Sequence, residues 1–286
     1  MIDFSFCDDL EISTRIRPSV NKMFLEKEEV LREQEFRSSS LPLCSVLSLY
    51  NMVVPQEQNF FADYYTSIGT AIHESFQKWH IKTLTAFGNW TCSCGKKFEE
   101  TTFPTCCGNI KYVEIELKYR GLSGHIDMCY KDGKKICIQD YKSTSLISLQ
   151  KMRQTKQISL KYRIQVLVYT HIMEKKGHIM GLPSLIFVAR DDPKSFLQIE
   201  IDWDAGISKK VGEFIEEQRL SFLAAKKSFK TRDLQYALEY RTCETEKDYS
   251  EFKKCLYKDC ILSSVCGPKV FKYAACEKKL KYLLDW

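Results

Sequence analysis

The chain has 286 residues, of which 44% are hydrophobic and 28% charged, and its net charge is +6 at pH 7. These values exclude a generally disordered chain and favour one elaborated domain, or one domain with insertions and extensions. No stretch approaches the roughly 18 consecutive apolar residues of a membrane span, and no signal-peptide pattern is present, so we expect a cytoplasmic protein with no membrane contact. In that compartment, the 13 cysteines are predicted to be metal ligands or free thiols rather than disulfides.

The first half of the chain is predicted to be helical before it turns to strands. Apolar residues at helical intervals predict helices over Ser19–Arg37 and Asn59–Thr83. The segment Asn89–Asn109 is rich in Cys, Gly and Thr, and we interpret it as an insertion with its own organising centre. Alternating residues then predict strands over Lys111–Arg120, Leu122–Lys131 and Lys134–Ser143.

The second half mixes helices with strands. Helices are predicted over Ile147–Arg153, Ser159–Lys175 and Ala205–Ala225, and strands over Ser184–Arg190 and Ser195–Ile201. With hairpins at the centre of the chain, this order predicts an α/β fold with a mixed central sheet flanked by helices.

Charged residues interrupt the two strands that meet at Asp132-Gly133, which we interpret as the two-residue loop of a hairpin. This loop would place Asp127 opposite Ile138, so that Asp127 and Asp140 are diagonal neighbours on one face. Such neighbours are about 7 Å apart, a gap that one divalent cation can bridge. Lys142 would point into the same space. An ordinary salt-bridged strand edge is the alternative interpretation.

Four short motifs carry a resemblance to a known family. They are "GHID" at Gly124–Asp127, "DYK" at Asp140–Lys142, "IGTAIHESF" at Ile68–Phe76 and "QVLVY" at Gln165–Tyr169. In this order the motifs resemble the PD-(D/E)XK nuclease superfamily, and particularly its RecB-like branch. The resemblance implies a restriction-endonuclease-like core and cleavage of DNA with Mg²⁺ or Mn²⁺.

The resemblance also implies roles for individual residues. The metal ligands would be His73, Asp127, Asp140 and the backbone carbonyl of Tyr141, and Lys142 would be the catalytic lysine. Glu116 is a further candidate acid, although Glu114 points the same way by alternation and the sequence does not separate the two. Gln165 and Tyr169 would position either the strand that carries the lysine or the nucleic-acid backbone.

Two groups of cysteines suggest further metal sites. Cys44 precedes the motifs, and Cys255, Cys260 and Cys266 follow them, as in the iron-sulfur nucleases of the AddB and CRISPR-associated type, which implies a [4Fe–4S] cluster. The interval between Cys255 and Cys260 is longer than in that family, so Cys243 and Cys276 are substitutes for Cys255. Buried free thiols and a zinc ion are the alternatives.

The second group lies in the insertion and consists of Cys92, Cys94, Cys106 and Cys107. Two pairs of cysteines, each followed by glycine, are typical of zinc-ribbon knuckles and predict a structural Zn²⁺. Because two of the cysteines are adjacent, either the site is distorted or one of the pair is not a ligand.

Together these patterns predict an N-terminal segment 1–58 with the first cluster cysteine, a nuclease core 59–203 that carries the insertion 89–109, and a Cys-rich C-terminal segment 204–286. The predicted function is metal-dependent DNA cleavage, with an exonuclease preferred, in recombination and repair, CRISPR adaptation or phage DNA metabolism. The predicted partners are DNA and proteins of those pathways, and the chain would act in a bacterial cell, where a phage could encode it. The alternative is a noncatalytic nuclease-fold module that binds DNA or serves as an adaptor.

Overall fold

A computed structural model describes residues 36–41, 60–192 and 194–231 of the chain. Internal contacts divide the chain into two units, and the larger unit comprises residues 37–39 and 57–215. The described part of the smaller unit includes residues 216–231, the last part of helix α7 (Ala205–Thr231). Among the described helices, none combines the length and apolar composition that a bilayer crossing needs.

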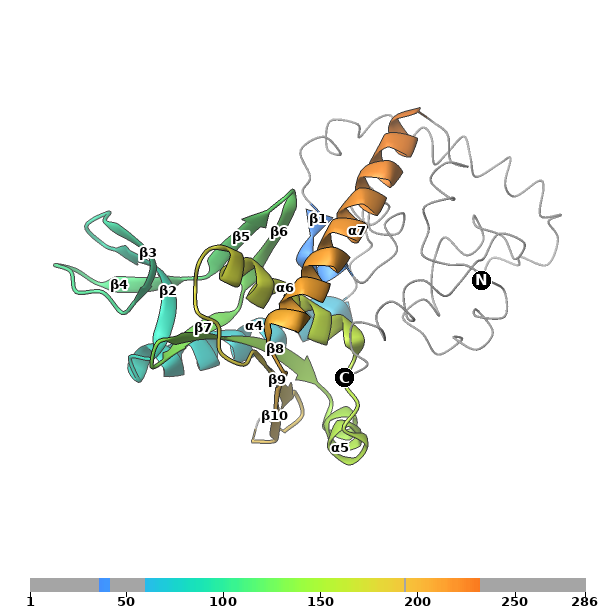
Figure 1. Cartoon of the computed structure of the whole chain (residues 1–286). Helices are drawn as coiled ribbons and strands as arrows, with labels where there is room; N and C mark the ends of the chain where they lie inside the picture. The colour runs from blue at the N-terminus through green and yellow to red at the C-terminus, as the bar shows by residue number, and fades with distance from the viewer. Residues whose placement is uncertain (1–35, 42–59, 193, 232–286) are drawn as a thin grey trace. The chain divides into compact units, whose positions relative to one another are not determined.

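The larger unit confirms the predicted α/β fold with a mixed central sheet and flanking helices (Figure 1). The central sheet is seven-stranded, with the order β10-β9-β8-β7-β2-β3 and with β4 paired to β2. In this order the strands are β10 (Phe196–Glu200), β9 (Ser184–Ala189), β8 (Lys135–Thr144), β7 (Met128–Asp132), β2 (Ala86–Cys92), β3 (Lys97–Thr102) and β4 (Ile110–Val113). Strands β8 and β9 run parallel, and the other paired neighbours in this sheet are antiparallel.

A second, three-stranded sheet has the order β1-β6-β5 and contains β1 (Phe36–Arg37), β6 (Leu122–Ile126) and β5 (Ile115–Tyr119). The two long strands predicted over Lys111–Arg120 and Leu122–Lys131 are therefore each divided between the two sheets. One acidic residue marks each division, Glu114 between β4 and β5 and Asp127 between β6 and β7. Ile115 pairs with Ile126, so the same register places Glu114 across from Asp127.

The predicted register of the central hairpin is wrong, because the two-residue loop lies one residue later in the chain than predicted. Asp132 pairs with Lys135, so the loop is Gly133-Lys134 rather than Asp132-Gly133. Gly133 has a φ of +58°, whereas Asp132 is not among the residues with positive φ. A turn with glycine at its first central position avoids the left-handed strain that the Asp-Gly loop would impose on aspartate. The ladder has Cys129, not Asp127, opposite Ile138, and its continuation brings Asp127 opposite Asp140.

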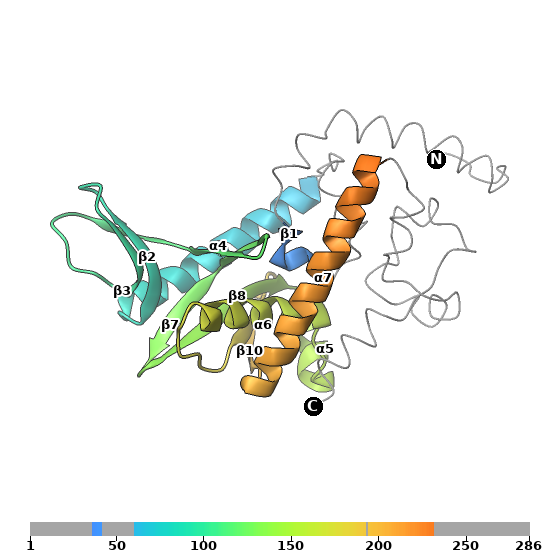
Figure 2. The same ribbon diagram turned by 45° about the horizontal axis from the view of Figure 1, so that its top comes forward.

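Helices cover both faces of β8 (Figure 2). Helix α4 (Phe60–Lys82) packs on the face that carries Tyr141, and the rings of Phe76 and Tyr141 stack at 4.8 Å between centroids. Helix α6 (Leu160–Lys175) packs on β8 as well and supplies Tyr169. Because adjacent residues of a strand point to opposite faces, Asp140 and Lys142 point away from the face that carries Tyr141.

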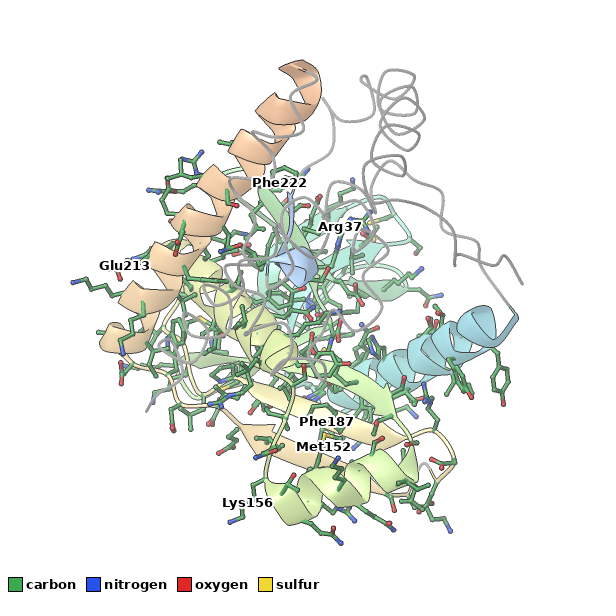
Figure 3. The ribbon with its side chains drawn as sticks, turned by 90° about the vertical axis from the view of Figure 1, so that its right-hand side faces the viewer. Arg37, Met152, Lys156, Phe187, Glu213 and Phe222 are labelled. Atoms are coloured by element: carbon green, nitrogen blue, oxygen red, sulfur yellow. The ribbon has the colours of Figure 1, made fainter. Side chains whose placement is uncertain are left out.

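The crossover between the parallel strands β8 and β9 contains helix α5 (Leu146–Thr155) as well as α6. Ser145 caps α5 by accepting a hydrogen bond from the backbone N–H of Ser148. At the other end, Lys156 adopts the left-handed conformation and donates its backbone N–H to Met152 O. Figure 3 labels both residues at α5. The two caps define the ends of α5, which contains the helix predicted over Ile147–Arg153 and extends beyond it at both ends.

The helix predicted over Ser19–Arg37 is wrong at its C-terminal end, where Phe36 and Arg37 form strand β1 and a 3₁₀ turn, Ser38–Ser40, follows. The rest of that helix lies outside the described residues. So do all six cysteines considered for the iron-sulfur cluster, Cys44, Cys243, Cys255, Cys260, Cys266 and Cys276. The [4Fe–4S] cluster therefore stays a prediction from the sequence.

Candidate active site

The two predicted catalytic acids lie next to each other at the junction of the two sheets. Asp140 and Lys142 belong to β8, and Asp127 follows the last residue of β6. The backbone N–H of Tyr141 donates to Asp127 Oδ2 at 2.8 Å. This bond fixes the Asp127 carboxylate against the backbone of β8 between Asp140 and Lys142.

The Asp140 side chain is fully buried, with 0% of its surface exposed. Its Oδ2 lies 2.7 Å from Lys142 Nζ, and this ion pair is itself largely shielded from solvent. Within the part of the chain that the structure describes, neither carboxylate oxygen of Asp140 has a partner with hydrogen-bond geometry. The ion pair with Lys142 offsets part of the cost of burying this carboxylate, and the second carboxylate nearby, Asp127, adds a repulsion that a further cation would offset.

His73 projects from α4 towards the backbone of Tyr141 and the Asp127 carboxylate. Its Nε2 lies 2.9 Å from the backbone oxygen of Tyr141, and because a carbonyl only accepts, Nε2 carries the proton. Its Nδ1 is 3.6 Å from Asp127 Oδ2. The four groups that the family resemblance assigns to the metal therefore lie around Tyr141: the His73 ring, two carboxylates and one backbone carbonyl.

Burial and mutual repulsion change the acidity of these groups. Burial, followed by the charge of Asp140, raises the pKa of Asp127 to about 8. Burial also raises the pKa of Asp140, although the ammonium of Lys142 opposes the shift. The pKa of Lys142 is raised, because the attraction of Asp140 and Asp127 outweighs its own burial. Burial lowers the pKa of His73, so its ring is neutral at pH 7.

This donor set fits a hard divalent cation. Carboxylate and carbonyl oxygens with one imidazole are ligands that suit Mg²⁺ and particularly Mn²⁺. The cation would also favour the ionised form of Asp127, whose pKa is raised first by burial and then by the charge of Asp140. Among the described residues, the side chains of His73, Asp127 and Asp140 are less tightly gathered than the four cysteines of the insertion, whose sulfur atoms all lie within 4.8 Å of one another.

The structure separates the two candidate acids that the sequence left open. Glu116 is exposed on β5 and pairs with Lys118 at 3.1 Å. Glu114 faces the candidate site, because Gln77 Nε2 donates both to Glu114 Oε1 at 2.8 Å and to the backbone oxygen of Asp127 at 2.9 Å. Gln77 thus connects Glu114 to Asp127, whereas Glu116 pairs with Lys118 on the exposed face of β5.

Gln165 and Tyr169 lie one helical turn apart on α6, and Gln165 Nε2 donates to Tyr169 Oη at 2.9 Å. Tyr169 also forms a hydrogen bond with Ser38. Burial, together with the negative charges of Asp140 and Asp127, raises the pKa of Tyr169. The Lys142 ammonium lies 5.3 Å from the ring centre of Tyr162, at the start of the same helix. Helix α6 therefore forms the wall of the site beside Lys142.

Gly124, the glycine of the first motif, is needed for close packing. A Cβ at this position would overlap Ser38 Oγ and would lie 2.9 Å from the Tyr169 ring. We expect Gly124→Ala to destabilise the protein by about 1–3 kcal/mol, the usual cost of overpacking a filled site. Denaturant unfolding measures this change in the free energy of unfolding.

The matched control is Gly69→Ala on α4. A Cβ there would meet only Ser143 Oγ, at an ordinary 3.5 Å, and alanine favours a helix over glycine by about 1 kcal/mol. We expect this variant to be as stable as the parent or more so. Equal stability of the two variants would contradict the packing role of Gly124.

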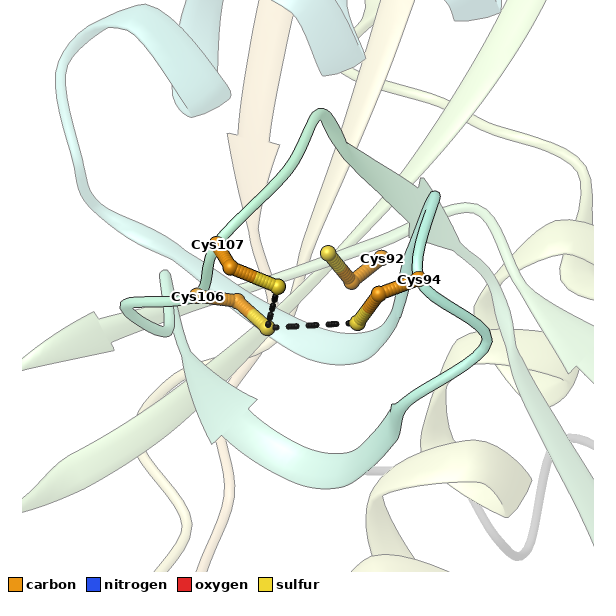
Figure 4. A group of neighbouring side chains, drawn as sticks. All are labelled: Cys92, Cys94, Cys106 and Cys107. Carbon is orange, nitrogen blue, oxygen red and sulfur yellow. Dashed lines mark hydrogen bonds between the residues drawn. The ribbon is translucent and has the colours of Figure 1, made fainter.

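The four cysteines of the insertion form the second candidate metal centre. Cys92 ends β2, Cys94 lies in the turn before β3, and Cys106 and Cys107 lie between β3 and β4. Their sulfur atoms all lie within 4.8 Å of one another, with 3.7 Å between Cys94 and Cys106 and 3.9 Å between Cys106 and Cys107 (Figure 4). A tetrahedral ion with Zn–S bonds of about 2.3 Å requires sulfurs about 3.8 Å apart. The four thiols could therefore bind a metal such as zinc, the adjacent pair included.

The first knuckle already stabilises a thiolate. Gly95 has a φ of +88° and donates its backbone N–H to Cys92 O, which closes the turn. The backbone N–H groups of Cys94 and Gly108 bond to the Cys92 sulfur, and the former is the main reason that the pKa of Cys92 falls to about 6. By its bond to Cys92, the pKa of Cys106 rises to about 11. The low pKa of Cys92 favours its thiolate, the form that binds a metal ion. The other cysteines would lose their protons when the metal ion binds.

Several residues around the acids carried no recognised signal in the sequence. Gln77 and Ser38 lie outside the four motifs, and the sequence does not separate Glu114 from Glu116 as the further acid. Gln77 lies four residues after His73, on the same face of α4, so helical spacing from the motif histidine is a signal that could have found it. Ser38 lies far from the motifs in the chain, and no local pattern marks it.

No protein-family model matches the chain, and no curated protein matches it at a significant level. The assignment of a function to this site therefore depends on the four motifs and on the side-chain geometry just described.

Proposed function

We propose that the chain is a metal-dependent deoxyribonuclease with a PD-(D/E)XK core of the RecB-like type, and that exonuclease activity is its preferred mode. The observation that carries the proposal is the juxtaposition of Asp127, Asp140 and Lys142 at one junction, beside His73 and the carbonyl of Tyr141. An ordinary salt bridge would explain Lys142 and Asp140. It leaves unexplained why a second carboxylate with a pKa of about 8 is held against the first.

Mg²⁺ or Mn²⁺ at this site would supply a Lewis acid for the phosphodiester and a water of lowered pKa. The ligands would be His73, Asp127, Asp140 and the Tyr141 carbonyl, with Glu114 close enough to influence Asp127 and His73 electrostatically. Lys142 would place its ammonium where negative charge develops on the phosphate. Asp140 and the Tyr162 ring hold that ammonium in place.

We further propose that Zn²⁺ in the four-cysteine group has a structural role and holds the ends of β2, β3 and β4 together. Four cysteines leave no position open for a substrate, which distinguishes a structural zinc from a catalytic one. The acid site would therefore carry out the cleavage reaction, and the zinc site would stabilise the fold.

The proposal is tested with end-labelled single-stranded and duplex DNA in the presence of Mg²⁺ or Mn²⁺. We expect the parent to degrade DNA only with the metal, and Asp140→Asn to lose about 100-fold or more of the rate, as expected when a charged metal ligand becomes neutral. Shortening of the DNA from its ends would identify an exonuclease. DNA binding without cleavage by the parent would instead identify the noncatalytic module.

The pKa of Asp127 gives a prediction about stability without metal. The folded protein keeps this carboxyl protonated up to about pH 8, whereas an unfolded aspartate loses its proton near a pKa of about 3.9. The folded state therefore binds more protons between these values, and its free energy of unfolding falls as the pH rises through that window. Unfolding in EDTA at pH 5 and pH 8 measures the fall.

Asp127→Asn provides the comparison, because it removes the titrating group and keeps its size. We expect its stability to change less with pH than that of the parent. Mn²⁺ should stabilise the parent more at pH 8 than at pH 6, since the metal competes with protons for the carboxylates. The same pH slope in both proteins would show that Asp127 is not the titrating group.

A further inference from the structure

A pocket of about 680 Å³ lies on the α4 face of the central sheet, within the larger unit. It is bounded by the C-terminal half of α4 and by the edge strand β10, and its walls include Phe76, Trp79, Tyr130, Phe196, Gln139 and Gln198. The volume falls within the range of about 300–1,000 Å³ that small-molecule sites occupy. None of the proposed catalytic residues and none of the four cysteines of the insertion lines this pocket.

The walls offer flat aromatic surfaces that are open to solvent. Trp79 is 57% exposed and Phe196 is 54% exposed, although both are large apolar side chains. Tyr130 stacks on His80 with 19° between the ring planes, so its ring is already held in a fixed orientation. Exposed aromatic rings on either side of a pocket are suited to stacking a planar heterocycle.

Gln139 contributes a polar group whose orientation is fixed. It is 6% exposed, and its Oε1 accepts from His80 Nε2 at 2.8 Å and from Tyr141 Oη at 3.1 Å. Because an amide oxygen only accepts, His80 Nε2 carries the proton, and the Thr85 hydroxyl can donate to His80 Nδ1 at 3.0 Å. Both acceptor positions of the amide oxygen are thus filled. Among the residues that the structure describes, the amide nitrogen has no hydrogen-bond partner, and it can donate to a ligand in the pocket.

We propose that this pocket binds a base of single-stranded nucleic acid, stacked against Trp79 and Phe196, with a base carbonyl accepting from the Gln139 amide. A base combines a planar π face with carbonyl acceptors at its edge, and the pocket offers partners for both. Gln198, exposed on β10, adds a second amide beside the same space.

The pocket is connected to the candidate active site through two elements. Phe76 forms part of its wall and stacks on Tyr141, whose backbone contacts both His73 and Asp127. Gln139 directly precedes Asp140 on β8. A nucleic acid whose base occupies the pocket would therefore contact the helix that carries His73 and the β-strand that carries Asp140, with Gln139 and Asp140 on opposite faces of that strand. The inference deepens the proposed nuclease function and rests on it for the choice of nucleic acid.

The test uses the full chain in EDTA, so that no cleavage occurs. The probe is a short oligothymidylate with one central 2-aminopurine, whose fluorescence is quenched by stacking, and a 2-aminopurine deoxynucleoside monophosphate is the second ligand. We expect Trp79→Ala and Phe196→Ala each to weaken oligonucleotide binding about tenfold and to relieve the quenching, as is typical when one stacking partner is removed. Tyr64→Ala is the matched control, because Tyr64 is an equally exposed aromatic residue on α4 outside the pocket.

The possible results separate the pocket from the nuclease. Equal binding by Trp79→Ala, Phe196→Ala and the parent, or an unquenched probe, would overturn the pocket assignment even if the parent cleaves DNA. Loss of binding in these two variants with no metal-dependent cleavage by the parent would support the pocket and reject the nuclease. A monophosphate that binds as tightly as the oligonucleotide would show a free nucleotide as the occupant and overturn the assignment to a strand. Circular dichroism of each variant confirms that it is folded.

Discussion

Lys142→Met is expected to reduce the rate of DNA cleavage by about 100- to 1,000-fold, the loss typical of removing one charged group that stabilises a transition state. The Lys142 ammonium is held by Asp140 at 2.7 Å and lies 5.3 Å from the centre of the Tyr162 ring. Its pKa is raised by the two neighbouring carboxylates, so it stays charged throughout the neutral range. Methionine keeps most of the side-chain volume and removes the charge.

Cleavage is measured in single-turnover reactions with saturating Mn²⁺ above pH 8, where competition from protons at the acids is weakest. The control is Lys135→Met, an exposed lysine at the other end of the same strand, which should cleave like the parent. We also expect Lys142→Met to keep its affinity for Mn²⁺, because the lysine is not among the proposed ligands. Cleavage by Lys142→Met at the parental rate would reject the catalytic role of the lysine and with it the proposed mechanism.

The general arrangement of this site could be predicted from the sequence because strand alternation is a local property. Asp140 and Lys142 share a face whatever the length of the hairpin loop, since they are two residues apart on one strand. The position of Asp127 relative to Asp140 depended on the turn. The loop Gly133-Lys134 replaces the diagonal arrangement with a position opposite Asp140, and the side chain stays on the same face because the register moves by an even number.

The division of two strands between two sheets could not be predicted in the same way. Glu114 and Asp127 lie within runs that alternate as continuous strands, and the breaks become visible only when the partner strands are known. The breaks also explain how charged residues are tolerated there. At a junction the ladder is interrupted, and Gln77 and the backbone of Tyr141 supply the hydrogen bonds that strand partners would otherwise provide.

The environment of Asp140 was beyond sequence reasoning for a different reason. Its burial depends on α6 and β9 packing around β8, and these contacts are distant in the chain. The same holds for Gln139, whose amide is oriented by a histidine 59 positions earlier. Local patterns therefore indicated which residues we propose for the chemistry, whereas long-range packing determines their burial and their free hydrogen-bonding groups.

Cys94→Ser and Cys107→Ser are each expected to lower the zinc content of the purified protein by one ion per chain and to destabilise the insertion. All four sulfurs lie at separations that fit a tetrahedral ion, and structural zinc sites contribute about 10–16 kcal/mol of apparent binding energy to folding. Cys94 and Cys107 are exposed, so serine at either position has little effect on packing itself. A change in stability in either variant would therefore result from the loss of the metal.

Zinc is measured by elemental analysis, and the state of the insertion by proteolysis between β2 and β4 together with the emission of Trp90, which is 1% exposed and donates to Thr101 O. Cys137→Ala is the control, because Cys137 is a free thiol on β8 outside the group, and it should keep the parental zinc content. A site with three ligands binds zinc far more weakly than a complete one. If Cys107→Ser retains the ion and Cys94→Ser loses it, Cys107 is not a ligand. Parental zinc content in both serine variants would reject the site, whatever the outcome for the nuclease.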